Sequence, residues 1–374
     1  MVAMGERIMK SSLVLSCIVV GALTTVTCKM MFQTSVVLPD GSIVAFDRSF
    51  FASLLNYVAI TMLVPLHALV GHVSTKIASD VPEVSPGEYN SREIICFVFS
   101  RSSLLIAACS VIVTICTQTA LLYVPATVYA CLRQGNIPMI VAIRIHILQK
   151  SYTQNQIIGA CVLTLGLVLM GAASYTGSDG SSNAMQYGFG ICLLCFAAVM
   201  LAGRYVSEEV LMQRDKVPPM IVVGAQGFLG SVACACILAF AHHSGHENFW
   251  TTLTMLRSST QVQVIIVEYV LVTALYNLMM AYTTQIFDAT CKGMIRGTKP
   301  VSVWGLELFC FYCFAARPGM QHYGEAWLSP RSWYVLAAGV IVTIGLFLYL
   351  LKDDKQIRKH MEESKLEYGA LIGK

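Results

Sequence analysis

Ten apolar runs, each near the roughly 20 residues that a helix needs to cross a bilayer, follow one another along this chain. They cover residues 11–33, 49–72, 94–118, 125–148, 154–175, 186–206, 218–241, 262–283, 289–314 and 332–351. Only 12% of the 374 residues are charged, about half the share in a soluble domain. Because lipid offers the backbone no hydrogen-bond partners, such runs must form helices. We therefore predict an all-α integral membrane protein with ten transmembrane helices.

An internal repeat indicates that the chain consists of two related halves. The stretch A-T-V-Y-A-C-L-R at 126–133 returns as A-T-C-K-G-M-I-R at 289–296, and a proline follows each copy. Downstream, T-L-G-L at 164–167 matches T-I-G-L at 343–346. A repeat at half-length inside hydrophobic helices is typical of transporters. We predict two inverted five-helix repeats, 11–175 and 186–351, which a linker loop at 176–185 joins.

The distribution of lysine and arginine predicts the orientation. With both termini in the cytosol, the cytosolic segments carry fourteen of these residues and the opposite segments carry four. Residues 1–10 then form a cytosolic N-terminus and residues 352–374 a cytosolic tail. In this tail, Tyr368-Gly-Ala-Leu371 fits the pattern that endosomal sorting adaptors bind. The motif favours a Golgi or endolysosomal membrane.

Two arginines at matched positions of the repeat lie well inside apolar runs: Arg133 and Arg296. A charge at the bilayer centre costs roughly 2.5–3.5 kcal/mol, so such a residue faces water, a partner or a ligand. Our hypothesis is that both arginines help to hold an anionic or zwitterionic substrate. The alternative is a structural role, in which each arginine is paired with a carbonyl group or a neighbouring acid.

Further cations and polar side chains accompany these arginines. Lys292 and Lys299 share a helix face with Arg296, and three cations on one stripe repel each other unless an anion lies between them. Alternatively, Lys292 snorkels to the membrane interface. Other side chains that we expect at the substrate site are Thr127, Thr290, Asn136 and Asn277. A threonine in a membrane helix can also bond to its own backbone.

Two acidic residues also lie inside apolar runs. They are Glu268, in I-I-V-E-Y-V, and Glu307, in W-G-L-E-L-F. Burial favours the neutral form of a carboxyl group, so either residue could bind and release a proton during transport. Each could equally neutralise a buried cation. The sequence leaves both roles open.

Glycines and cysteines on the apolar runs suggest packing rather than chemistry. Gly224, Gly227 and Gly230 recur every three residues, and Gly159 and Gly166 lie on another run, which predicts close helix contacts. Pairs such as Cys192-x-x-Cys195 resemble metal-ligand spacings, but they lie among Leu, Phe and Ala. We predict that such cysteines are buried, inert thiols. His242-His243-x-x-His246 is interpreted as a solvated or pH-sensitive loop rather than a metal site.

Several stretches, in this order, resemble solute carrier family 35 F-type transporters. They are Gly21–Lys29 (G-A-L-T-T-V-T-C-K), Tyr123-Val-Pro-Ala-Thr127 through Leu132-Arg133, Glu208-Glu209 followed by Val217-Pro218, and Val223–Gly230 (V-G-A-Q-G-F-L-G). The resemblance covers about residues 11 to 350. It implies the drug/metabolite transporter superfamily, which includes nucleotide-sugar, triose-phosphate and chloroquine-resistance-type transporters. Such proteins have ten helices in two inverted halves and work by alternating access. The stretch 292–300 departs from the lysine motif of the sugar-nucleotide carriers.

These features predict a secondary transporter that moves a small polar organic solute, anionic or zwitterionic, by alternating access. The alternatives are a non-transporting scaffold or receptor on the same fold, or a transporter of cationic drugs or peptides. No H-E-x-x-H or G-x-S-x-G motif is present, so we predict no enzyme. We expect a small-molecule solute and the lipid bilayer as partners, without nucleic acid, cofactor or metal ion. Homodimer formation stays open.

Overall fold

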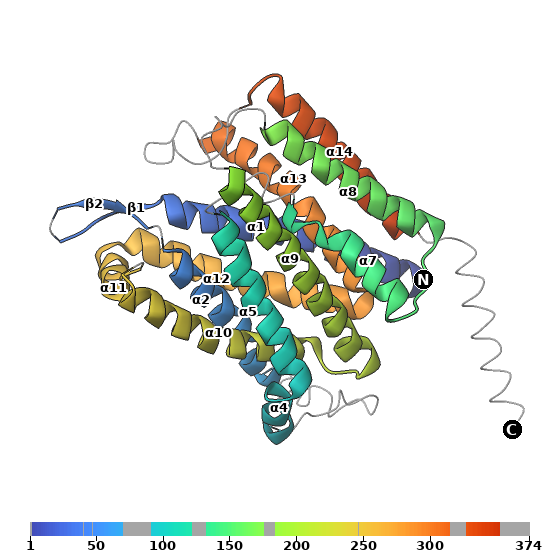
Figure 1. Cartoon of the computed structure of the whole chain (residues 1–374), viewed down its shortest axis with the longest axis horizontal. Coiled ribbons are helices and arrows are strands. Elements are labelled where there is room, and N and C mark those ends of the chain that lie inside the picture. The colour runs from blue at the N-terminus through green and yellow to red at the C-terminus, as the bar shows by residue number, and fades with distance from the viewer. Residues whose placement is uncertain are drawn as a thin grey trace, which may run out of the picture.

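The computed structural model of the protein describes residues 2–351 apart from 40, 47, 70–90, 122–131, 176–183, 246 and 315–326. Thr127, His246 and the tail motif Tyr368–Leu371 therefore lie outside the described residues. The described part is a bundle of helices with one small β-hairpin (Figure 1). The elements are α1 (Val2–Gln33), β1 (Ser35–Val37), β2 (Ile43–Ala45), α2 (Ser49–Thr61), α4 (Ser91–Val98), α5 (Arg101–Leu121), α7 (Asn136–His146), α8 (Gln154–Tyr175), α9 (Ala184–Glu209), the π-helix η2 (Val210–Arg214), α10 (Pro219–His243), α11 (Phe249–Ser258), α12 (Thr260–Ile286), α13 (Ala289–Phe314) and α14 (Arg331–Leu350).

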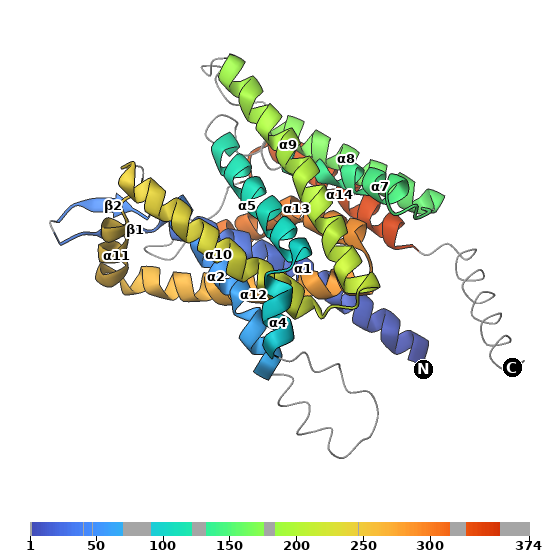
Figure 2. The ribbon, with the colours of Figure 1, turned by 60° about the horizontal axis from the view of Figure 1, so that its bottom comes forward.

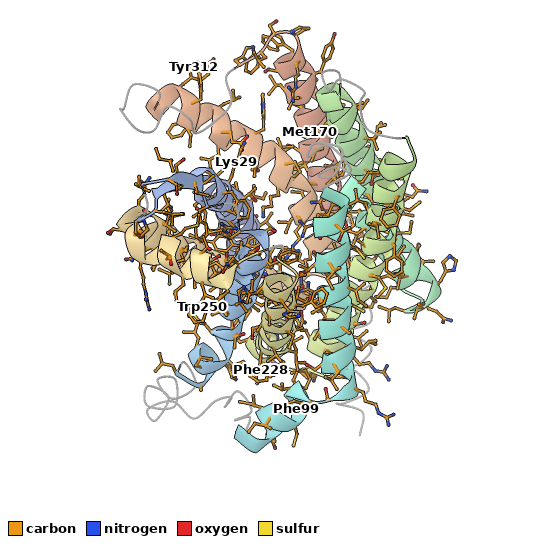
Figure 3. The ribbon with its side chains drawn as sticks, turned by 60° about the vertical axis from the view of Figure 1, so that its left-hand side comes forward. Lys29, Phe99, Met170, Phe228, Trp250 and Tyr312 are labelled. Carbon is orange, nitrogen blue, oxygen red and sulfur yellow. The ribbon has the colours of Figure 1, made fainter. Side chains whose placement is uncertain are left out.

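Seven helices of the described chain are long and apolar enough to cross a membrane by length and composition. They lie at Ser11–Phe32, Ser49–Leu69, Gln154–Ala173, Gly188–Arg214, Pro219–His243, Thr260–Ile286 and Arg331–Leu350. Large apolar and aromatic side chains, including Phe99, Phe228 and Trp250, lie exposed on the outside of the bundle (Figure 3). A surface of this kind is suited to contact with lipid. These features are those of an all-α, multi-pass membrane protein.

The helices follow the predicted apolar runs with some differences. The run predicted at 94–118 is divided into α4 and α5, with a break at 99–100. The described part of the run 125–148 contains the short helix α7. Neither the β1–β2 hairpin nor α11 was predicted from the sequence. In the antiparallel hairpin, Ser35 pairs with Ala45 and Val37 with Ile43. Both elements lie at the same end of the bundle, the hairpin end (Figures 1 and 2).

Glycines bring helix pairs into close contact, as predicted. A Cβ atom at Gly159 would lie 2.6 Å from the backbone nitrogen of Tyr349, so α8 and α14 touch through their backbones. A Cβ atom at Gly227 would lie 2.5 Å from the backbone nitrogen of Thr61, which brings α10 against α2. The prediction of packing faces at these glycines is therefore confirmed.

The predicted burial of the cysteine pair on α9 is wrong. Cys192 and Cys195 are both exposed on the described structure. The physical reason is that an apolar helix face at the outside of a membrane bundle meets lipid, so an apolar sequence context does not require burial inside the protein.

Candidate functional site

A cavity of about 340 Å³ lies inside the bundle, between residues of α1, α2, α5, α9, α10, α12 and α13. Four cationic side chains line it: Arg133, Arg204, Arg296 and Lys299. No aspartate or glutamate is found among its described lining residues. The cavity is therefore strongly cationic, in a part of the molecule where charges are costly.

Arg296 and Lys299 lie one helical turn apart on α13 and contact tyrosines rather than acids. The Arg296 Nη1 atom donates a hydrogen bond of 2.5 Å to the Tyr205 hydroxyl, and its guanidinium lies 5.3 Å from the centre of the Tyr205 ring. The Lys299 ammonium lies 5.0 Å from the ring centre of Tyr276, which Arg296 also approaches at 5.5 Å. In the described chain neither cation forms an ion pair. Aromatic rings offset such charges only in part.

Arg204 lines the cavity and also forms an ion pair with Glu208, which does not line it. Its Nε atom donates to Glu208 Oε1 at 2.8 Å, and its Nη2 atom donates to Gln226 Oε1 at 2.9 Å. The fully buried Glu208 also pairs closely with Lys292. One carboxylate thus serves two cations, and the cavity region keeps an excess of positive charge.

The rest of the lining combines aromatic faces with hydrogen-bonding groups. Tyr57, Tyr205, Tyr269 and Tyr276 contribute rings. Two buried N–H groups of lining residues, at Arg296 Nε and Gln226 Nε2, have no hydrogen-bond partner in the described chain. Buried donors are normally satisfied, so these groups suit a ligand that accepts hydrogen bonds. A small organic anion with a polar or ring-shaped body matches this set.

The structure brings together four of the eight residues predicted for substrate binding. Arg133, Arg296, Lys299 and Asn277 line the cavity. Lys292 lies behind the Tyr205 ring, 4.8 Å from its centre, and does not line the cavity.

The other predicted residues lie elsewhere. Asn136 is buried outside the cavity lining, and neither of its side-chain polar atoms has a partner in the described chain. Glu307 forms an ion pair of 2.8 Å with Lys29, and Glu268 lies on the exposed face of α12. Thr290 belongs to a second polar group, described next.

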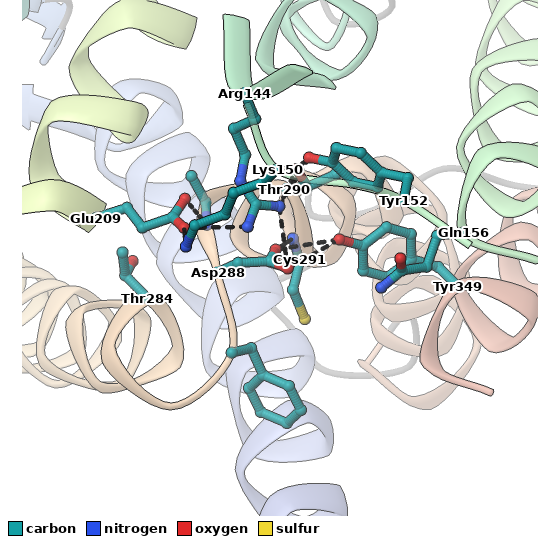
Figure 4. A network of polar contacts seen from close by, with 12 residues as sticks. Arg144, Lys150, Tyr152, Gln156, Glu209, Thr284, Asp288, Thr290, Cys291 and Tyr349 are labelled. Atoms are coloured by element: carbon teal, nitrogen blue, oxygen red, sulfur yellow. Dashed lines mark hydrogen bonds and ion pairs between the residues drawn. The ribbon is translucent and has the colours of Figure 1, made fainter. Parts of the chain in front are cut away.

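A polar network, drawn from close by in Figure 4, lies at the end of the bundle opposite the hairpin (Figure 1). We define the Arg144 network as Arg144, Lys150, Tyr152, Glu209, Asp288, Thr290 and Tyr349. These residues come from the end of α7, the α7–α8 connection, the end of α9, the α12–α13 connection, the start of α13 and the end of α14. The network therefore ties four helices, α7, α9, α13 and α14, and two connections together at one end, which we call the network end.

Arg144 is the centre of this network. Its guanidinium donates to Tyr152 at 2.7 Å and Glu209 at 3.0 Å, and it lies 3.1 Å from the carboxylate of Asp288. Lys150 donates to the same Glu209 oxygen at 3.0 Å. Burial raises the pKa of Tyr152, so its hydroxyl stays protonated and can donate to Thr290 at 2.7 Å. Two cations and two carboxylates balance one another here.

The cavity and the network are neighbours along the same helices. Glu209 follows Arg204 by five positions on α9, and Arg296 follows Thr290 by six positions on α13, which correspond to about 8 and 9 Å of helix. The sequence reading missed Arg204 and Arg144 as site residues. A signal for Arg204 was available, because Arg204 lies in the apolar run 186–206 and Glu208 follows four residues later.

Comparison with known proteins informs the fold alone. No known family model matches the chain, and no curated protein matches it. A solved protein crystal structure is similar in fold. Its TM-score is 0.56 at 13% sequence identity, and the match covers 90% of this chain and 96% of the other. Because the identity is low, this likeness supports the architecture over nearly the whole chain and gives no activity.

Proposed function

We propose that this chain is a secondary transporter that carries a small organic anion across the membrane by alternating access. The observation that carries the proposal is the cavity lining, with Arg133, Arg204, Arg296 and Lys299 and no acid among its described residues. A cation inside apolar helices costs roughly 2.5–3.5 kcal/mol. Such a group is retained where a ligand can compensate it.

The proposed architecture is ten helices in two inverted five-helix halves, 11–175 and 186–351, as in the drug/metabolite transporters that the sequence resembles. The cavity supports it, because its lining comes from both proposed halves, for example Thr24 and Thr114 from the first and Arg204 and Arg296 from the second. Cytosolic termini and a Golgi or endolysosomal membrane are part of this proposal. The network end would then face the cytosol, and the hairpin end the opposite side.

The site argues for transport of an anion over the alternatives. A scaffold has no need for a polar cavity and would be expected to neutralise the cations inside its bundle, yet Arg296 and Lys299 have no carboxylate partner in the described chain. A cationic drug would be repelled by the four lining cations.

The proposal is tested by thermal melting of the purified protein with a panel of solutes. The panel contains nucleoside monophosphates, nucleotide sugars, sugar phosphates, amino acids, peptides and cationic drugs. A ligand at 100 times its dissociation constant adds about 2.7 kcal/mol of stability, which a melting curve resolves. We expect stabilisation by anions, and uptake of the best stabiliser into liposomes that contain the protein.

Matched variants locate the site. Arg296→Met and Lys299→Met each remove one charge from the cavity and should abolish the shift. Arg257→Met removes an exposed charge of α11 and should leave the shift intact. Stabilisation by cationic solutes alone, or by no member of the panel, would reject the proposal.

A further inference from the structure

Two adjacent carboxylates, Glu208 and Glu209, end α9 and serve different parts of the molecule. Both are buried, with exposures of 0% and 1%. Glu208 binds Arg204 and Lys292 on the cavity side, whereas Glu209 binds the cations of the Arg144 network. Successive residues of a helix point about 100° apart, so neighbours can face two different sites.

Both carboxylates also hold the first turn of α13. Glu208 does so through Lys292, and Glu209 Oε2 accepts a hydrogen bond of 3.1 Å from the backbone nitrogen of Ala289. The same helix carries Arg296 and Lys299 one to two turns further on. A movement of α13 that follows binding in the cavity must therefore strain or release both carboxylates.

The segment after Glu209 strengthens this connection. Residues Val210–Arg214 form a π-helix, and Gln213 in it donates to the carbonyl oxygens of Thr284 at 3.0 Å and Phe287 at 2.8 Å. π-helical turns are rare and are found frequently at functional sites. The side chains of Glu209 and Gln213 thus bind backbone atoms at the end of α12, in the α12–α13 connection and at the start of α13.

Arg204 links this arrangement to the ligand. It lines the cavity together with Arg296 and Lys299, yet its guanidinium is held by Glu208 at 2.8 Å. An anion that enters the cavity offers Arg204 a second negative partner. Because that anion attracts the same positive charge and repels the Glu208 carboxylate, the hold of Glu208 on Arg204 weakens when the cavity is occupied.

On the basis of the anion transport proposed above, we propose that Glu208 and Glu209 couple occupancy of the cavity to opening of the network end. With the cavity empty, Glu208 holds Arg204 and Lys292, and Glu209 keeps the Arg144 network closed. An anion competes with Glu208, the contact between α9 and α13 loosens, and Glu209 releases Arg144. Both glutamates are positioning residues, since they act through the cations.

A native cysteine reports on this opening. Cys291 lies in the first turn of α13, is 1% exposed and donates its backbone N–H to Asp288 at 2.6 Å. Cys234 is similarly buried, at 4%, but belongs to a separate core cluster around α10. Alkylation by N-ethylmaleimide, resolved residue by residue with mass spectrometry, therefore compares an informative thiol with a control thiol in one sample.

The experiment uses the full chain in nanodiscs with inorganic pyrophosphate as the anion probe. We expect pyrophosphate to speed alkylation of Cys291 about tenfold, a usual size for coupling between two sites, and to leave Cys234 unchanged. In Glu208→Gln, alkylation of Cys291 should be fast without pyrophosphate, and its rate should not change when pyrophosphate is added. Glu208→Asp keeps the carboxylate and should restore the response. In Glu209→Gln, alkylation of Cys291 should be fast, and pyrophosphate should still raise the melting temperature.

The outcomes separate this inference from the proposed function. If neither pyrophosphate nor any anion of the solute panel shifts the melting curve, the anion site itself is rejected. If pyrophosphate binds but the alkylation rate of Cys291 does not change, the coupling is overturned and the anion site stands. A response that persists in Glu208→Gln also overturns it. If Glu208→Gln fails to fold, wild type and Glu209→Gln decide the question by the same two readouts.

Discussion

The Arg144 network offers a direct test of how burial sets the strength of an ion pair. Arg144 and Lys150 donate to the same atom, Glu209 Oε1, at the same distance of 3.0 Å. The side chain of Arg144 is 6% exposed, whereas that of Lys150 is 46% exposed. Arg144→Ala and Lys150→Ala therefore compare a buried and an exposed cation on one shared acceptor.

The two variants should differ strongly in stability. Arg144→Ala removes the contacts to Tyr152, Thr290, Glu209 and Asp288 and leaves two carboxylates without their main cation. Breaking a buried ion pair from one side costs about 3–5 kcal/mol, because a buried charge is left uncompensated. An exposed pair is worth about 0–1 kcal/mol, because water screens it. We expect losses of these two sizes in the free energy of unfolding.

Unfolding in mixed micelles with a rising fraction of dodecyl sulfate, followed by tryptophan fluorescence, measures this free energy for wild type and both variants. The double variant adds a check, since the two residues share one acceptor and their effects should not add. Equal losses for Arg144→Ala and Lys150→Ala would refute the reasoning, because both cations lie 3.0 Å from the same Glu209 oxygen, whereas only Arg144 is buried and has a second carboxylate partner.

Three further predictions concern the frame around the cavity and use the same unfolding assay. Gly345→Ala should lower stability by about 1–3 kcal/mol, because a Cβ atom there would lie 2.5 Å from the backbone of α8, whereas Gly188→Ala meets open space and should not. Glu247→Ala should cost about 1–2 kcal/mol, because its carboxylate accepts two backbone N–H groups in the first turn of α2 at 3.0 and 3.1 Å. Tyr57→Phe should cost about 0.5–1.5 kcal/mol through its lost 3.0 Å contact with Thr114, and an unchanged stability would contradict this role of the hydroxyl.

The helical frame could be predicted from the sequence because an apolar run in lipid must satisfy its backbone hydrogen bonds internally, as a helix does. Each predicted run contains a helix in its described part. The hairpin could not be found in this way, because Ser35–Val37 and Ile43–Ala45 have three residues each and lie outside the apolar runs. Strands of that length have no reliable periodicity. The helix α11 was missed for a similar reason, since its composition is mixed and its ten residues cannot span a bilayer.

Three of the four cations that line the cavity could be predicted, but the partners of the cations could not. Arg296 and Lys299 stand out because a charge inside an apolar run needs a reason. Which acid meets which cation depends on contacts between distant parts of the chain: Lys292 meets Glu208 across 84 residues, and Arg144 meets Glu209 across 65. Adjacent glutamates look equivalent in the sequence, and only the fold assigns one to each site.

The difference in charge balance between the two sites follows from what each must do. The Arg144 network contains two cations and two carboxylates in mutual contact, so it can stay dry and closed without any other molecule. Among the described residues of the cavity region, Glu208 pairs with Arg204 and Lys292, and tyrosine rings offset the charges of Arg296 and Lys299 only in part. An excess of buried positive charge is unfavourable unless water or an anion reaches it. The cavity is therefore suited to hold water or an anion, whereas the Arg144 network needs neither.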